Sequence, residues 1–378
     1  MNTQESNSKP LYKLFDSEPV TATEAINLFL PYAASVRASD VHYDPSEDGV
    51  RIRLRVDGQV EEVAHMSRKL HEEIIARLKI LSGARTDIHA VPQDGRWRSE
   101  ISGDDYNIRI SFMPTYHGEN AVIRLLPARI SSEISFAKLG FTPDHVRAID
   151  GSLAQASGLI LVCGPTGSGK TTTLHTCLSL KSREPISIIT LEDPVEYEIP
   201  MVRQVHIRHS HGVTFASGLR AALRQDPDVI MVGEIRDAET ARVAIHTALT
   251  GHLVLSTIHT NSALEAIPRL MDMGVDPYLL ASTLRLVVAQ RLVRALCREC
   301  FSDGCEGCRH TGYSGRSVIA EACMVDAGLR ELIVSRASSS AMTDYVRSIG
   351  FVPMSEDGHE KVEWGITTPQ EVARVLAD

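Results

Sequence analysis

A glycine-rich string in the middle of the sequence restricts the possible architecture of this chain more than any other segment. It reads Gly164-Pro165-Thr166-Gly167-Ser168-Gly169-Lys170-Thr171-Thr172. An apolar run, residues 159–163, precedes the string, and a helical pattern follows it as far as residue 180. We therefore predict a buried strand, a tight loop and a helix in immediate succession.

The residue types in this string match the requirements of phosphate binding. Glycines let backbone N–H groups curl around phosphate oxygens, where a Cβ atom would collide. Lys170 would supply a positive charge to the β- and γ-phosphates, and the Thr171 hydroxyl would ligate Mg²⁺. The helix would add the positive end of its dipole. The string predicts a site for ATP and Mg²⁺; the alternative is a glycine-rich turn without a ligand.

The residues around the string predict an α/β fold with a parallel sheet. Short apolar runs without alternation are separated by helical stretches, which is typical of a sheet covered on both faces. These runs are residues 158–162, 186–191, 229–232 and 253–256. After Arg291 the pattern fades into a cysteine-rich segment, then resumes at residues 317–323 and in three short helical segments up to Asp378.

Polar residues follow three of these runs where the strands are expected to end. Glu192, Glu234 and His259 each stand just beyond an apolar run. Ligands of open α/β sheets bind beyond the carboxyl ends of the strands, so these side chains are candidates for catalysis. We predict that Glu192 polarises the attacking water and that Glu234 holds Mg²⁺ through water. The alternatives are exposed turn acids and an ordinary loop histidine.

The region before the glycine-rich string has a different pattern and predicts a small α+β domain that ends near Pro127. Helical spacing covers residues 21–37 and 67–81. Residues 50–56 alternate between apolar and arginine, and Asp57-Gly58 turns them into a second strand at residues 59–63, which predicts a β-hairpin. Further short strands are expected at residues 95–101, 106–112 and 121–125.

Four of the seven cysteines lie close together near the C-terminus. Cys297, Cys300, Cys305 and Cys308 form a C-x2-C-x4-C-x2-C pattern, and thiolates in two such pairs are typical ligands of structural Zn²⁺. Free thiols or an iron–sulfur cluster are the alternatives. The remaining cysteines lie in apolar stretches and are expected in the core: Cys163, Cys177 and Cys323.

Composition narrows the class further. Among 378 residues, 39 Lys+Arg against 48 Asp+Glu give a net charge of −9. An acidic balance argues against nucleic acid as the main partner. No apolar run approaches the roughly 20 residues that span a bilayer, and the polar start is unlike a signal peptide. We expect a cytosolic protein.

Beyond these local patterns, the chain resembles the secretion ATPases of type II secretion and type IV pilus assembly (GspE/PilB-like). The resemblance covers nearly everything after about residue 20 and rests on a series of motifs. They are Arg37-Ala38-Ser39-Asp40-Val41-His42, Pro92-Gln93-Asp94-Gly95-Arg96, Arg109-Ile110-Ser111-Phe112-Met113-Pro114-Thr115, Leu191-Glu192-Asp193-Pro194-Val195-Glu196, Gly233-Glu234-Ile235-Arg236-Asp237, and Thr250-Gly251-His252-Leu253 through His259-Thr260-Asn261.

The resemblance implies a RecA-like P-loop ATPase domain over residues 136–378, which includes the tetracysteine motif 297–308 and the C-terminal helices. A smaller PAS-like domain is expected over residues 21–128, with a flexible arm at 1–20 and a linker at 129–135. Arg96 and Arg109 match the family's phosphate-contacting arginines, and Arg124 is a weaker candidate; the alternative is that they are ordinary surface arginines.

The resemblance also implies how the protein works. It would be a homohexameric motor that powers type IV pilus assembly or type II secretion from the cytoplasmic face of the inner membrane. It would be a short form without the family's extra N-terminal domain and would be held to the membrane through a platform protein. Two alternatives stay open, an ATP-dependent zinc protein that binds nucleic acid and a pilus motor of the retraction type. The cysteines favour assembly or secretion over retraction.

Overall fold

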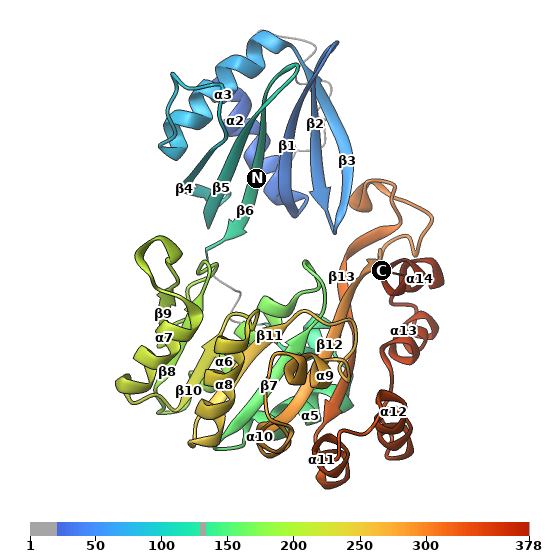
Figure 1. The fold of residues 1–378 in the computed structure, drawn as a ribbon. Coiled ribbons are helices and arrows are strands. Elements are labelled where there is room, and N and C mark those ends of the chain that lie inside the picture. Colours follow the sequence, from blue (N-terminus) through green and yellow to red (C-terminus); the bar gives the residue numbers. More distant parts are fainter. Residues whose placement is uncertain (1–20, 129–133, 378) are drawn as a thin grey trace. The chain divides into compact units, whose positions relative to one another are not determined.

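The structure is a computed structural model that describes residues 21–128 and 134–377 (Figure 1). The expected arm at residues 1–20 and most of the expected linker, residues 129–133, lie outside the described residues. The chain divides into two compact units, Met1–Ile130 and Ser131–Asp378. Each unit is described on its own.

In its described residues, 21–128, the first unit is an antiparallel sheet of six strands, in the order β3-β2-β1-β6-β5-β4, with two helices. The strands are β1 (Ala38–Ser46), β2 (Gly49–Val56), β3 (Gln59–Met66), β4 (Gln93–Ile101), β5 (Asp104–Thr115) and β6 (Gly118–Pro127). The helices are α2 (Ala22–Ser35) and α3 (Arg68–Ser82). The hairpin predicted around Asp57-Gly58 is confirmed, with Val56 opposite Gln59 across the turn.

Alternation along the strands explains why only one face of this sheet joins the core. In β2, Val50, Ile52, Leu54 and Val56 are all buried and pack with the apolar sides of α2 and α3. The arginines between them point to the opposite face, because successive side chains of a strand alternate. That opposite face carries the arginines of β2.

The second unit is built on a sheet of seven strands in the order β13-β12-β7-β11-β10-β8-β9. Its strands are β7 (Gly158–Cys163), β8 (Ile188–Glu192), β9 (Arg203–His206), β10 (Val229–Val232), β11 (Leu253–Ile258), β12 (Leu284–Leu296) and β13 (Tyr313–Met324). Neighbouring strands from β12 to β9 run parallel, whereas β13 pairs antiparallel with β12. The predicted α/β fold with a parallel sheet is therefore confirmed, with one antiparallel edge added.

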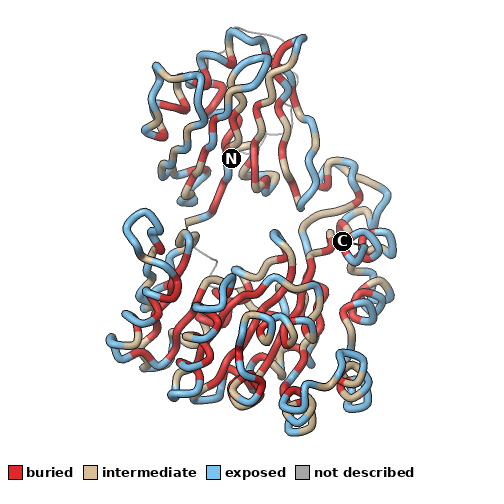
Figure 2. The backbone as a smooth tube through the Cα atoms, viewed as in Figure 1, coloured by how far each residue is buried: buried red, intermediate tan, exposed pale blue. Residues whose placement is uncertain are grey.

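Helices cover both faces of this sheet, so its central strands are buried throughout (Figure 2). One face packs against α4 (Phe136–Leu139), α5 (Pro143–Leu153) and α6 (Lys170–Lys181). The other packs against α7 (Phe215–Ala222), α8 (Ala238–Leu249), α9 (Ala266–Asp272) and α10 (Pro277–Thr283). All six residues of β7 are buried, which explains why its sequence shows no alternation.

The pattern that fades after Arg291 belongs to β12, a continuous strand of 13 residues that runs on to Leu296. Its polar residues Gln290 and Arg291 are buried by partners from distant parts of the chain. The expected number of C-terminal helices is wrong. Four helices rather than three follow β13 in the described chain. They are α11 (Ala327–Val334), α12 (Ser339–Ser348), α13 (Met354–Glu363) and α14 (Pro369–Leu376). Gly350, with a φ of 94°, and Pro353, the N-cap of α13, separate two of them.

Candidate nucleotide-binding and catalytic site

The glycine-rich string forms the loop between β7 and α6, as predicted. Gly164, Gly167 and Gly169 have φ values of 144°, 81° and 89°, a region that other residues rarely adopt. A Cβ atom on Gly164 would lie 2.6 Å from the backbone oxygen of Gln290. The loop therefore needs these glycines both for its turns and for its close approach to β12.

The loop and the start of α6 are well suited to an anion. The N-cap of α6 is Gly169, which makes no side-chain cap, so no capping side chain occupies the N–H groups of the first turn. Thr171, which would ligate Mg²⁺ through its hydroxyl, is exposed at the start of the helix. Phosphate and Mg²⁺ thus fit the residues of this loop.

Lys170 bends back over the loop. Its ammonium donates to the carbonyl oxygens of Gly164 at 2.7 Å and Pro165 at 2.8 Å. These bonds use two of its three protons and hold the charge beside the loop. Burial is the main reason why the pKa of Lys170 falls to about 8; the carboxylate of Glu234 is close enough to oppose that fall.

The strand order places the predicted site residues in a row along one edge of the sheet. The phosphate loop follows β7, His259 follows β11, Glu234 follows β10, and Glu192 ends β8. In the sheet these four strands are consecutive neighbours, in that order. With strands about 4.8 Å apart, Glu234 follows the second strand from β7 and Glu192 the third, roughly 10 and 14 Å away at the backbone. The order of these residues in the sequence does not show how far each of them lies from the phosphate loop.

Glu234 and His259 lie together next to the loop. The His259 Nε2 atom is 3.7 Å from a Glu234 oxygen, and the same oxygen is 2.6 Å from the Nε of Arg236. Burial, and then the nearby charge of Lys170, lower the pKa of His259, which favours its neutral form. Two hydrogen bonds of Thr257 hold the segment around Glu234 in place. Thr257 Oγ1 donates to the Gly233 carbonyl at 2.8 Å, and the Ile235 N–H donates to the Thr257 carbonyl.

Glu192 is held in a separate buried cluster. It is only 4% exposed. One carboxylate oxygen accepts from the Thr190 hydroxyl at 2.5 Å and the Gln204 amide at 3.0 Å, while the other lies 3.3 Å from Nε2 of His175. Burial works to raise the pKa of Glu192, but these hydrogen bonds outweigh it and the pKa is lowered. The side chain is thus kept ionised.

Sequence reasoning missed His175 and Gln204. His175 lies on α6, five positions after Lys170, and is fully buried with its ring edge-on to Tyr197. Through it, the helix that begins at the phosphate loop touches Glu192. Both contacts join residues far apart in the chain, and no local pattern marks them.

Arg96 and Arg109 belong to the first unit and lie side by side there. Arg96 faces Arg109 across β4 and β5, Arg109 faces Arg124 across β5 and β6, and Arg124 faces Asp40 of β1. Directly opposed residues share a face of the sheet, so these side chains form one row. Asp40 anchors the row through a 2.8 Å contact with Nε of Arg124.

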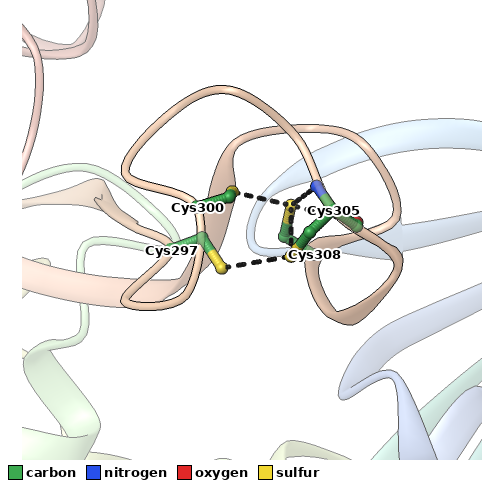
Figure 3. A group of neighbouring side chains, drawn as sticks. All are labelled: Cys297, Cys300, Cys305 and Cys308. Carbon is green, nitrogen blue, oxygen red and sulfur yellow. Dashed lines mark hydrogen bonds between the residues drawn. The ribbon is translucent and has the colours of Figure 1, made fainter.

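The four clustered cysteines come together after the end of β12 (Figure 3). Their sulfur atoms all lie within 4.8 Å of one another, a spacing that fits a tetrahedral thiolate site. Backbone N–H groups of Cys305 and Gly312 donate to the Cys308 sulfur at 3.2 and 3.3 Å. Although burial opposes the thiolate, these bonds lower the pKa of Cys308 to about 6. The other cysteines, Cys163, Cys177 and Cys323, are buried as expected.

A lysine-bearing glycine loop at the carboxyl edge of a parallel sheet, with carboxylates along the same edge, defines a P-loop ATPase. Comparison with known proteins gives the family. Residues 15–374 match the family described as Type II/IV secretion system protein, and the chain belongs to that family.

Individual relatives agree with this assignment. Type II secretion system protein HxcR of Pseudomonas aeruginosa is 42% identical over 371 residues, 96% of this chain and 78% of that protein. Type II secretion system ATPase E of Vibrio cholerae is 41% identical over 388 residues, 96% of this chain and 76% of that protein. The family predicted from the sequence is confirmed, together with its ATPase activity and its place in secretion or pilus machinery.

Solved structures share the fold. The ATPase DotB of Legionella pneumophila superposes with a TM-score of 0.74 at 23% identity, covering 96% of this chain and 98% of that one. The pilus retraction motor PilT with bound ADP gives a TM-score of 0.66 at 25% identity, covering 95% of this chain and 98% of that one. Within the described part of the chain, every helix is too short or too polar to cross a membrane.

Proposed function

We propose that this protein is a Mg²⁺-dependent ATP-hydrolysing motor that acts as a homohexamer on the cytoplasmic face of the inner membrane. It would power type II secretion or type IV pilus assembly through a platform protein. The observation that carries the proposal is the row of the phosphate loop, His259, Glu234 and Glu192 on four consecutive strands. The type II secretion names of the relatives favour secretion.

In this proposal each part of the loop has one task. Backbone N–H groups between Gly164 and Thr172 surround the phosphates, and Lys170 turns its ammonium from the loop carbonyls to a phosphate oxygen. Thr171 would ligate Mg²⁺ directly and Glu234 would hold it through water. His259, kept neutral beside Glu234, would orient the terminal phosphate by hydrogen bonding. Mg²⁺ supplies charge neutralisation at the phosphates.

Glu192 would orient and polarise the attacking water. The oxygen toward His175 is the one suited to this task, because its 3.3 Å contact is the longest of the three. The other oxygen would keep its two donors and hold the carboxylate in place. His175 and Gln204 are positioning residues in this scheme.

The two units would have different roles. We propose that residues 21–128 form a PAS-like domain and residues 136–378 a RecA-like ATPase domain joined by a linker at 129–135. Arg96 and Arg109 of the first domain would compensate the triphosphate charge, because one lysine does not balance it. Their adjacent positions on β4 and β5 support a joint role.

The tetracysteine segment would bind one structural Zn²⁺ through Cys297, Cys300, Cys305 and Cys308. The segment from 297 to 312 contains a single short 3₁₀ turn and few apolar residues. A metal would stabilise a segment that has too little core of its own.

The decisive experiment compares Lys170→Ala with Lys181→Ala. Both lysines lie on α6, at opposite ends, and Lys181 pairs with Glu184 away from the loop. We expect Lys170→Ala to lose Mg²⁺-dependent ATP turnover by at least about a hundredfold, because it removes a positioned charge from the phosphate. Lys181→Ala should retain turnover. Equal turnover in the two variants would contradict the assignment of the site.

A further inference from the structure

Gln290 of β12 is fully buried and contacts the phosphate loop at two points. Its neighbour Ala289 pairs with Cys163, the last residue of β7, which brings Gln290 level with the start of the loop. Its backbone oxygen occupies the space that a Cβ on Gly164 would need. Its side-chain amide donates to the Ser168 carbonyl at 2.8 Å.

The orientation of this amide is determined by its partners. A carbonyl oxygen only accepts, so the NH₂ group of Gln290 must face Ser168. The amide oxygen accepts from the Thr173 hydroxyl at 2.9 Å, on the first turn of α6. Ser168 and Thr173 are themselves buried, so each of these bonds would be costly to lose. One side chain thereby joins β12, the loop and the helix.

The bond to Ser168 also determines where the next N–H group points. In a trans peptide the carbonyl of one residue and the N–H of the next point in opposite directions. Because the Ser168 carbonyl points to Gln290, the N–H of Gly169 points away from β12. Gly169 has no side chain and a φ of 89°, so it does little to fix this peptide plane by itself.

We propose that Gln290 is a positioning residue for nucleotide binding: it holds the Ser168–Gly169 peptide so that the Gly169 N–H faces the phosphates. The proposal rests on the proposed role of the loop as the nucleotide site. Gln290 touches no phosphate; it acts through the peptide. It stands more than a hundred positions after the loop and outside the motifs that identify the site from sequence.

The test measures binding of ADP with Mg²⁺ by calorimetric titration, and ATP turnover, in three variants. Gln290→Met keeps the length of the side chain but removes donor and acceptor. Gln290→Glu keeps the shape and sets a carboxylate against the Ser168 carbonyl. Gln204→Met is the matched control, since its amide donates to Glu192 and the Tyr197 carbonyl rather than to the loop.

We expect both Gln290 variants to bind ADP about tenfold more weakly and to raise the KM for ATP equally, with kcat changed less than about threefold. Gln204→Met should instead lower kcat and leave ADP affinity unchanged. The unfolding midpoint is measured with and without ADP. A positioning role predicts that the rise in this midpoint on adding ADP shrinks in the Gln290 variants and not in the control, whereas a packing role alone would lower the nucleotide-free midpoint and leave the rise unchanged.

Three results would overturn the proposal: ADP affinity within about twofold of wild type in either Gln290 variant, an equal loss of affinity in Gln204→Met, or an undiminished ADP-dependent rise in the midpoint. If Gln290→Met does not fold, Gln290→Glu decides alone. Lys170→Ala distinguishes a failure of the proposed nucleotide site from a failure of the proposed role of Gln290. If it binds ADP normally, the nucleotide site itself is wrong; if it loses ADP while the Gln290 variants do not, only the role of Gln290 is wrong.

Discussion

Replacing Glu192 by glutamine separates its chemical role from its structural one. The structure gives this carboxylate three contacts, with Thr190, Gln204 and His175. In Glu192→Gln the amide oxygen can keep the donors from Thr190 and Gln204. The new NH₂ group then faces Nε2 of His175, which donates to the ionised Glu192 and accepts from the amide once the histidine proton moves to Nδ1. All three contacts survive, so we expect a loss of about 1 kcal/mol in the free energy of unfolding, from weaker, uncharged bonds.

The expected loss in turnover is much larger. An amide does not polarise water as a carboxylate does, and removing a general base costs about a hundredfold to ten-thousandfold in rate. The assay is phosphate release at saturating ATP, with ADP affinity and urea unfolding measured on the same preparation. Turnover within about tenfold of wild type, with ADP affinity unchanged, would refute the role of Glu192 in water activation. A loss of several kcal/mol in stability would show that the three contacts are not kept.

Three further outcomes are expected. Burial lowers the pKa of Lys170 to about 8, and only its ammonium form attracts phosphate. ADP affinity should therefore be constant below pH 8 and fall toward tenfold per pH unit above it. Titration of ADP binding from pH 7 to 10 checks this, and a flat profile contradicts it. Elemental analysis should find one Zn²⁺ per chain. Chelation should expose residues near Cys305 to protease without changing ADP affinity. A stable, metal-free preparation would show that the four cysteines are packed thiols and not a zinc site. Arg109→Ala should lower turnover strongly with little change in nucleotide affinity. If the arginine serves a neighbouring subunit, mixing this variant with Lys170→Ala chains should restore some activity. Mixed rings without any recovery would show that the arginine acts within its own chain.

The features that the sequence predicted correctly are those written into contiguous residues. The phosphate loop needs its glycines, its lysine and the flanking strand and helix, and all of these are adjacent. The hairpin at Asp57-Gly58 and the pairing of two C-x2-C segments are likewise local. In each case neighbouring residues satisfy the geometric requirement without help from the rest of the chain.

The features that were missed depend on distant partners. β12 contains Gln290 and Arg291, two polar residues that interrupt the apolar pattern, yet both are buried. Gln290 bonds with Ser168 and Thr173, and Arg291 donates to Asn261. From sequence alone a polar pair in a strand indicates its end, because its partners are unknown. The enclosure of Glu192 by His175 and Gln204 was missed for the same reason.

The order of the strands has a consequence for how this protein is made. β7 carries the phosphate loop, but its neighbours β11 and β12 begin only at Leu253 and Leu284. A ribosome that adds 5–20 residues per second needs about 6–24 s to travel from the end of β7 to the start of β12. During that interval the wholly apolar strand Gly158–Cys163 lacks both neighbouring strands until β11 is made, and lacks one of them until β12 follows; such a strand is prone to aggregation. A chain that stops before Leu284 never pairs β7 with β12, so such truncation products are expected to require chaperones or to precipitate.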